Sequence, residues 1–156
     1  MTHFIHENGM YRTVGEGELS AQPSLNPHFY NFSVISPVYC DGSNFAGAMD
    51  HPNVTMPGGG TATLHVRGRA ILKATLDIAL EQWGLKDTLQ QVMLTGCSAG
   101  GTATYFNVDY VHKYIASKLT HDRPLHTRAF GNAGWFLDTN SATCAILPHA
   151  AASLTH

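Results

Sequence analysis

A lone serine between small residues is the first candidate for chemistry in this chain. Ser98 lies at the centre of Gly96-Cys97-Ser98-Ala99-Gly100, which matches the pattern G-x-S-x-G. In that pattern the serine stands on a sharp turn from a strand into a helix, and small neighbours two positions away relieve crowding. Such a serine can attack an ester carbonyl, and the N–H of Ala99 would face the oxyanion that forms. The alternative interpretation is an ordinary glycine-rich connection.

The segments on either side of this serine supply the context that the pattern requires. An apolar strand is expected over 91–95, and a helix over 100–119 whose apolar stripe holds Phe106, Val111, Tyr114 and Ile115. Gly101 adds one more glycine to the turn. A strand, then the motif, then a helix favours a nucleophile over a plain connection.

The rest of the chain is expected to build the scaffold around this turn. Residues 1–28 show no clear period and are expected to form loops, and 48–63, with two prolines and three consecutive glycines, a long loop. Val34, Ile35, Val38 and Tyr39 indicate a strand near Pro37, and another strand is expected over 125–136.

A helix is expected over 65–83 and should end at Gly84. Its expected buried face repeats at steps of three and four residues: Val66, Ala70, Ile71, Ala74, Ile78, Ala79 and Trp83. The order strand, helix, strand, helix, strand predicts an α/β fold, with a parallel sheet flanked by helices. Because three strands make a thin sheet with open edges, we expect residues 1–156 to form one incomplete domain.

Composition excludes several classes of partner. The 156 residues are 44% hydrophobic and only 13% charged, with a net charge of −2 and no basic stripe, so nucleic acid is not an expected ligand. No segment reaches the length of a membrane span, and the N-terminal residues lack the apolar run of a signal peptide.

Cysteine and histidine spacing indicates no metal site. Cys40 and Cys97 are on neighbouring segments, so either they pair or Cys97 is a buried thiol, while Cys144 is left over. His3 and His6 have no third ligand placed by spacing, so scattered loop histidines are expected instead. Two triplets, 31–33 and 53–55, fit the N-glycosylation pattern, which matters only in an exported chain.

Three blocks in register resemble the pectin acetylesterase family, which also contains the Notum carboxylesterases. The family's nucleophile segment resembles TGCSAGGTATYFNVD of this chain, and its N-P-x-F-Y-N-W … Y-C-D-G segment resembles NPHFYNFSVISPVYCDGSNFAGA. Its GWFLD segment resembles GNAGWFLD, and together the three blocks cover about 26–138. The resemblance implies an α/β-hydrolase-like fold and a secreted serine esterase without metal or cofactor. The implied substrates are acetyl esters of pectin-like polysaccharide or, as in Notum, a fatty acyl group on a signalling protein.

The resemblance carries over to few residues. It places Ser98 on the family's nucleophile, Ala99 on an oxyanion-hole residue, and Phe136 in a segment like part of the acyl-pocket wall. Asn132 stands where the family usually has Asp. The family's catalytic Asp and His lie beyond the GWFLD segment and its G-G-G-W-C block lies upstream, so we expect a partial chain that lacks them.

Alternatives to this interpretation remain. Asp138 and His149 follow Ser98 in the chain order of a triad, but their spacing is poor, and the resemblance gives Asp138 a structural role. The chain is therefore expected to be a weak or inactive part of an esterase, a short active esterase, or a non-catalytic α/β module that binds carbohydrate or protein. Side chains with expected ordinary roles are Asp109 and His112 at the surface and Tyr105 and Phe106 in the core.

Overall fold

The N-terminal part of the chain contains a hairpin that the sequence pattern did not predict. The computed structural model describes residues 3–7, 10–14, 17–49 and 52–134, and it divides into two compact units, 1–38 and 39–156. In the first unit β1 (His3–Glu7) pairs antiparallel with β2 (Met10–Val14), and a short 3-10 helix, η1 (Gly17–Leu19), follows. The loop expected over residues 1–28 is therefore wrong at its start, where residues with high β propensity form the two strands.

The strand expected around Pro37 does not form. Residues 33–38 belong to no strand, and the side chains of Val34, Ile35 and Val38 are exposed. A proline lacks the N–H that a ladder needs, and among the described residues no strand pairs with this segment. Upstream of it, the buried Asn26 amide donates to the carbonyl groups of Glu18 and Ser20, each at 2.9 Å, which fixes the preceding turns.

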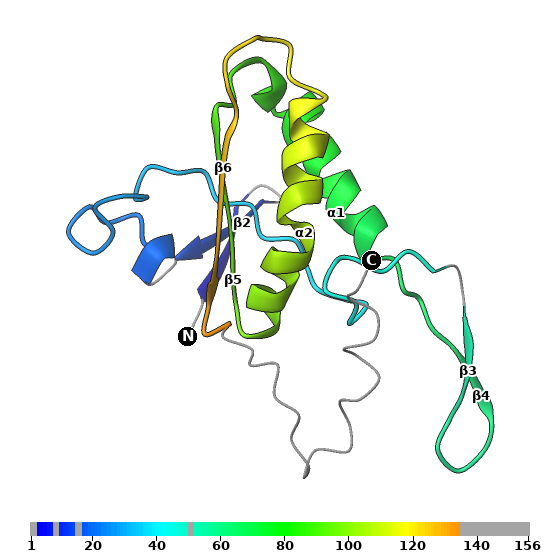
Figure 1. Ribbon diagram of the computed structural model, residues 1–156. Coiled ribbons are helices and arrows are strands. Elements are labelled where there is room, and N and C mark those ends of the chain that lie inside the picture. The colour runs from blue at the N-terminus through cyan, green and yellow to red at the C-terminus, as the bar shows by residue number, and fades with distance from the viewer. Residues whose placement is uncertain (1–2, 8–9, 15–16, 50–51, 135–156) are drawn as a thin grey trace, which may run out of the picture. The chain divides into compact units, whose positions relative to one another are not determined.

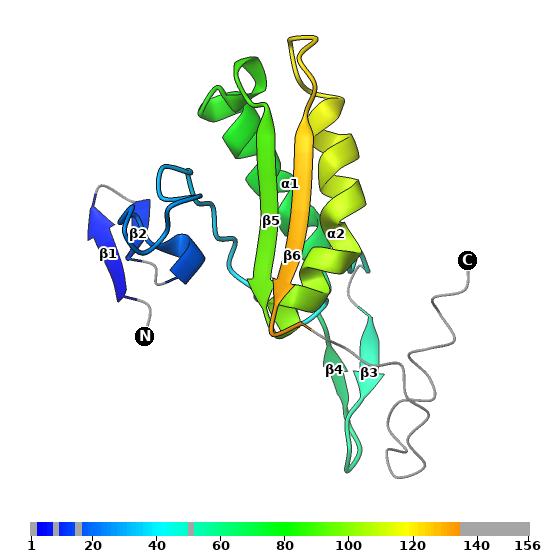
Figure 2. The ribbon, with the colours of Figure 1, turned by 60° about the vertical axis from the view of Figure 1, so that its left-hand side comes forward.

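The second unit contains the strand–helix–strand segment that the sequence predicted. β5 (Gln91–Cys97) leads into α2 (Ala99–Ala116), and β6 (His126–Asn132) returns parallel to β5. The register runs from Gln91 opposite His126 to Cys97 opposite Asn132. Figures 1 and 2 show α1 and α2 on the same face of this pair of strands. The α/β class is confirmed, although in the described residues the sheet has two strands rather than three.

The first helix is shorter than expected and buries only part of the expected face. α1 (Gly68–Asp77) continues into one wider π-helical turn, η2 (Ile78–Gln82), and Gly84 follows with the expected left-handed backbone, before a 3-10 turn, η3 (Leu85–Asp87). Ala79 is buried as expected, but Ile78 and Trp83 are 39% and 53% exposed. Leu72 and Leu80, which lie outside the expected face, are buried. The leucines give a second apolar stripe about one residue away from the expected one, and they bury more apolar surface than the exposed Ala70 and Ala74 would.

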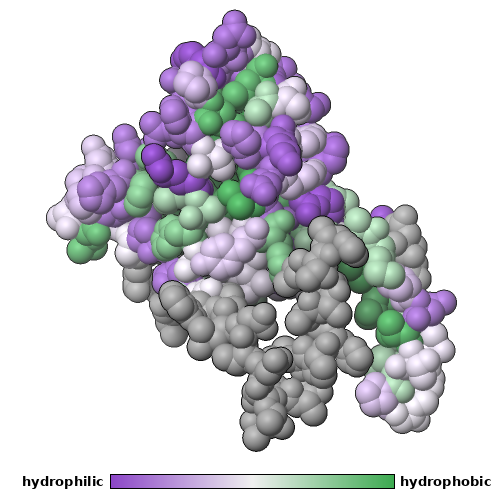
Figure 3. Space-filling model, in the orientation of Figure 1, coloured by the Kyte–Doolittle hydropathy of each residue, from purple (hydrophilic) through white to green (hydrophobic). Residues whose placement is uncertain are grey.

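The core of the second unit lies between the two helices and the inner face of the strands. Leu72 and Leu80 pack with Val111 and Ile115 of α2, and the partly buried Val92 and Leu94 of β5 pack against this cluster. Each fully buried aliphatic side chain stabilises the fold by about 1.5–3 kcal/mol. The surface over α1 and α2 is mostly hydrophilic, with smaller hydrophobic areas between (Figure 3).

A hairpin occupies part of the expected loop over residues 48–63. β3 (Asn53–Thr55) pairs antiparallel with β4 (Thr61–Thr63), and the base of the hairpin is extended by a bridge between Met49 and Val66. The glycines at 58, 59 and 60 have φ values of 94°, 90° and 95°, which residues with a side chain rarely adopt. The three glycines therefore form the turn of a hairpin.

A short loop, residues 41–47, holds the start of α1 and the middle of α2. The Asp41 carboxylate accepts hydrogen bonds from the Ser43 hydroxyl at 2.6 Å, the Ser43 N–H at 3.1 Å and the Gly68 N–H. Desolvation raises the pKa of Asp41, but these hydrogen bonds outweigh it and the pKa lies below its usual value. From α2, the buried Asn107 amide donates to the Asn44 carbonyl at 2.7 Å.

Candidate active site

Ser98 has the strained backbone expected of a nucleophile elbow. Its φ and ψ are 56° and −114°, a conformation that a residue with a side chain rarely adopts and that costs about 1–3 kcal/mol. Hydrogen bonds hold the residue in place: its N–H donates to the Asn132 carbonyl at 2.9 Å, and its own carbonyl accepts from Gly101 at 2.9 Å and Thr102 at 3.2 Å. The turn is thereby tied to the end of β6 and to the first turn of α2.

The two glycines of the motif have different roles in this turn. A Cβ at Gly96 would lie 2.5 Å from the carbonyl carbon of Gly100 and 2.8 Å from its Cα, so only glycine fits there. A Cβ at Gly100 would meet no described atom within 4 Å. The expectation that both glycines relieve crowding is therefore confirmed at Gly96 and wrong at Gly100, because the side chain of a residue at position 100 would project into open space.

Further glycines let the start of α2 approach the strand ends closely. Gly101 is buried, and a Cβ on it would lie 3.0 Å from the Cα of Gly134 and 3.3 Å from that of Gly131. A Cβ on Gly131 would in turn lie 2.9 Å from the Tyr105 hydroxyl. A helix and strand this close leave no room for side chains between them, so these glycines fix how near Ser98 lies to β6.

The environment of the turn suits a negative charge. Ser98 and Ala99 are exposed, and within the described part of the chain the N–H groups of Ala99 and Gly100 make no hydrogen bond. They lie at the N-terminus of an 18-residue helix, where the helix dipole favours anions. The geometry can therefore present a hydroxyl, with free backbone donors beside it, to a carbonyl group from solvent.

The cysteine that precedes the serine is neither paired nor buried. Cys40 and Cys97 are both free and exposed, so both interpretations drawn from the sequence are wrong. Side chains alternate along a strand, and Gly96 faces the start of α2. Cys97 consequently points to the face of β5 away from α2.

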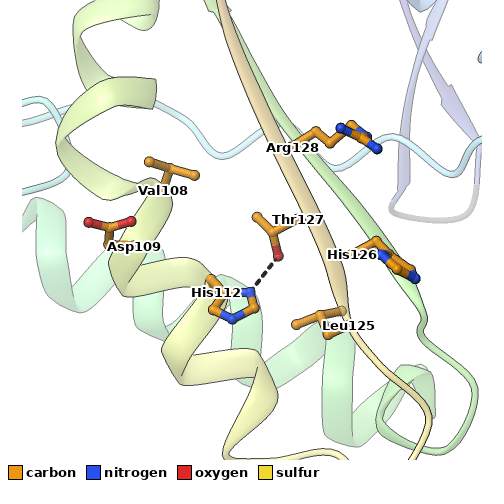
Figure 4. A pocket seen from close by; sticks show the side chains of 7 residues that line it. All are labelled: Val108, Asp109, His112, Leu125, His126, Thr127 and Arg128. Carbon is orange, nitrogen blue, oxygen red and sulfur yellow. Dashed lines mark hydrogen bonds between the residues drawn. The ribbon is translucent and has the colours of Figure 1, made fainter.

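Beside α2 there is a hollow of about 340 Å³, away from the elbow. It is lined by Val108, Asp109, His112, Leu125, His126, Thr127 and Arg128 (Figure 4). The His112 Nδ1 lies 2.8 Å from the Thr127 hydroxyl, while His126 and Arg128 extend on the other side of β6, so the charged groups do not converge. Asn132 lies five residue steps along β6 from Thr127, or about 17 Å, so the hollow is remote from Ser98.

Several residues predicted from sequence lie outside the described part of the chain. These are Phe136, Asp138, Cys144 and His149. Tyr105 and Phe106 are described and are 53% and 46% exposed, so the expectation of core positions is wrong. The buried stripe of α2 instead runs through Gly101, Thr104, Asn107, Val111 and Ile115, which leaves these two rings on its flank.

The sequence pattern missed the contribution of residues 131–134 to the turn. The backbone carbonyl of Asn132 holds the Ser98 N–H, a contact that does not depend on which side chain stands at 132. Ala133 has a positive φ of 50°, which places Gly134 against Gly101. The spacing Gly-Asn-Ala-Gly is a signal of close backbone approach that could have revealed this contact.

Within the described residues the structure holds no group of three or more His, Cys, Asp or Glu side chains arranged to bind a metal ion. None of the helices that it describes combines the length and hydrophobicity that a membrane span requires.

Comparison with known proteins finds a matching family and several relatives. Residues 8–150 match the family model described as pectinacetylesterase. Pectin acetylesterase 5 of Arabidopsis thaliana is 33% identical over 123 residues, 79% of this chain and 26% of the relative. Pectin acetylesterase 4 of the same plant is 36% identical over 104 residues, 67% of this chain and 24% of the relative.

A second kind of relative covers even more of the chain. Palmitoleoyl-protein carboxylesterase notum1a of Danio rerio is 32% identical over 131 residues, 84% of this chain and 24% of the relative. The chain thus spans about a quarter of the length of the curated relatives it matches. Since the family model covers most of its residues, the chain belongs to the pectinacetylesterase family, which includes relatives of both the pectin acetylesterase and the Notum type.

Proposed function

We propose that this chain carries the nucleophile of a serine carboxylesterase and that Ser98 is that nucleophile. The observation that carries the proposal is the positive φ of 56° at Ser98, directly between β5 and α2. The Ser98 ψ of −114° lies outside the ordinary left-handed region, and strain of this kind, about 1–3 kcal/mol, clusters at active sites. Exposure of the serine and membership of an esterase family support the same conclusion.

The proposed reaction is acyl transfer in two steps. The Ser98 hydroxyl attacks the ester carbonyl, its proton passes to a base, and the alcohol leaves; water then releases the acid from the acyl-serine. The N–H of Ala99 stabilises the oxyanion, a contribution that can reach about 3 kcal/mol per donor. The proposal does not assign the base to His112, because that side chain is bound to Thr127 at a distance from the turn.

As substrate we propose acetyl esters on a pectin-like polysaccharide, reached outside the cell. Support comes from the names of two relatives, pectin acetylesterases 5 and 4, which are 33% and 36% identical to this chain. The second candidate is a palmitoleoyl-protein carboxylesterase, because notum1a matches 84% of the chain at 32% identity. Phe136, in the segment that resembles the acyl-pocket wall, would contact the acyl group in either case.

Capture of an acetyl group on Ser98 tests the nucleophile. The purified chain is incubated with p-nitrophenyl acetate, with and without imidazole, which supplies an external base. Mass spectrometry then measures acetylation of the peptide that contains Ser98. We expect acetylation that imidazole increases and that Ser98→Ala abolishes.

A matched control separates this chemistry from general serine reactivity. Ser117 is exposed at the other end of α2, so Ser117→Ala should leave acetylation at Ser98 unchanged. If Ser98 gains no more acetyl than Ser117 in the presence of imidazole, the nucleophile proposal is wrong. Binding of acetylated pectin without acylation would then favour a non-catalytic carbohydrate-binding module.

A further inference from the structure

We propose that Asn53 is an acceptor site for an N-linked oligosaccharide. Asn53-Val54-Thr55 fits the N-x-[ST] pattern with no proline in the middle, and esterase chemistry at Ser98 makes no use of it. The donor would be an oligosaccharide on a polyprenyl diphosphate. The Asn53 Nδ2 forms a bond to C1 of the first sugar, the bond from C1 to the diphosphate oxygen breaks, and one amide proton is lost.

The hairpin presents both recognition groups from one side. Asn53 and Thr55 are the first and third residues of β3, and side chains two apart lie on the same face of a strand. Both residues are exposed, whereas Val54 between them is half-buried. A transferase that must contact the amide and the hydroxyl together can therefore reach both without opening the hairpin.

The hydrogen bonding of Asn53 leaves its nitrogen available. The Asn53 Oδ1 accepts a hydrogen bond from the Thr63 hydroxyl at 2.8 Å across the hairpin, which orients the amide. In the described part of the chain no hydrogen bond involves its Nδ2. All residues from Thr55 to Thr61 are exposed as well, so the turn does not shield the site.

The other triplet of this pattern is less suited to the reaction. Asn31 is exposed, but it lies within tight turns: the Tyr30 N–H donates to the Asn26 carbonyl at 3.2 Å and the Phe32 N–H to the Phe29 carbonyl at 3.0 Å. On the extended strand β3 the asparagine amide and the threonine hydroxyl of the triplet lie on one face, an arrangement that the turns around Asn31 do not have. The proposal is therefore limited to Asn53.

The inference rests on the proposed export of the protein, so the test directs the chain into microsomes with an added secretory leader. The full chain, behind a cleavable secretory leader, is translated with endoplasmic-reticulum microsomes, and only protease-protected molecules are scored. Treatment with a peptide N-glycosidase converts each glycosylated asparagine to aspartate, which mass spectrometry locates. We expect conversion at Asn53 in most protected molecules.

Variants on the same hairpin separate the site from its surroundings. Asn53→Gln and Thr55→Ala should abolish the sugar at 53, while Thr55→Ser should retain it. Thr61 pairs with Thr55 on the same exposed face, so Thr61→Ala should also retain it. Protected wild-type chains without sugar at Asn53 would overturn the proposal. Acetylation of Ser98 is measured on bacterial protein without glycans, so each proposal can fail alone.

Discussion

The two glycines of the serine motif should respond differently to replacement by alanine. In Gly96→Ala the new Cβ would lie 2.5 Å from the carbonyl carbon of Gly100, at least about 1 Å inside the usual contact distance of about 3.5–4.0 Å. Either α2 shifts or the turn opens. Overpacking of this kind costs about 1–3 kcal/mol, and an opened turn also loses the Ser98 hydrogen bonds, at about 1 kcal/mol each. We expect a loss of about 3 kcal/mol in the free energy of unfolding.

In Gly100→Ala the new Cβ meets no described atom, and alanine is the better helix former by up to about 1 kcal/mol. That variant should be as stable as the wild type or slightly more stable. Urea titration followed by far-UV circular dichroism measures both free energies, and acetylation of Ser98 reports whether the turn survives. Equal destabilisation by the two variants, or a loss below about 0.5 kcal/mol for Gly96→Ala, would refute the steric argument.

Three further predictions concern the surroundings of the site. Asp41→Asn should destabilise the chain near neutral pH and much less in acid. Hydrogen bonds lower the pKa of Asp41 in the folded state, so its contribution to the free energy of unfolding is fully present above the unfolded-state pKa and is lost as pH falls through the folded-state pKa. Urea titrations between pH 7 and about 3 would measure this loss. Asn107→Ala should cost about 1–3 kcal/mol, because it leaves the Asn44 carbonyl without its donor; the same titration at pH 7 measures this. Cys40 and Cys97 should both react with a thiol reagent in the folded chain, whereas slow reaction of either until urea is added would contradict their exposure.

Local patterns were sufficient to predict the elements next to the serine. The apolar residues before Gly96 formed β5, the helical period after it formed α2, and Gly84 took the left-handed backbone expected of a residue that ends a helix. These signals act over a few residues, so the sequence contains them directly.

Features that depend on distant contacts were not predictable in this way. α1 carries two apolar stripes, and only packing against Val111 and Ile115 decides that Leu72 and Leu80 are the buried ones. The extended segment before Tyr39 has strand-forming residues, but a strand also needs a partner.

The same distinction applies to the candidate site. The residue types of the motif predicted the strained turn at Ser98, because the cause of the strain is local. The carbonyl of Asn132 that holds the turn lies 34 positions further along the chain, and the register of β5 and β6 that brings it there is set by packing. The exposure of Cys97 follows from the pleat of β5, which the sequence pattern left undecided.

The contact between Asn107 and Asn44 joins residues 63 positions apart. Bringing the ends of such a loop together costs about 4 kcal/mol of chain entropy, since this cost grows with the logarithm of loop length. Because nearby contacts such as those of α1 with α2 shorten this loop, we expect the contact to form after α2 has folded and packed. Substitutions of Asn107 should accelerate unfolding and leave the refolding rate almost unchanged. The contact of the 41–47 loop with α2 would then help to determine how long the native state persists.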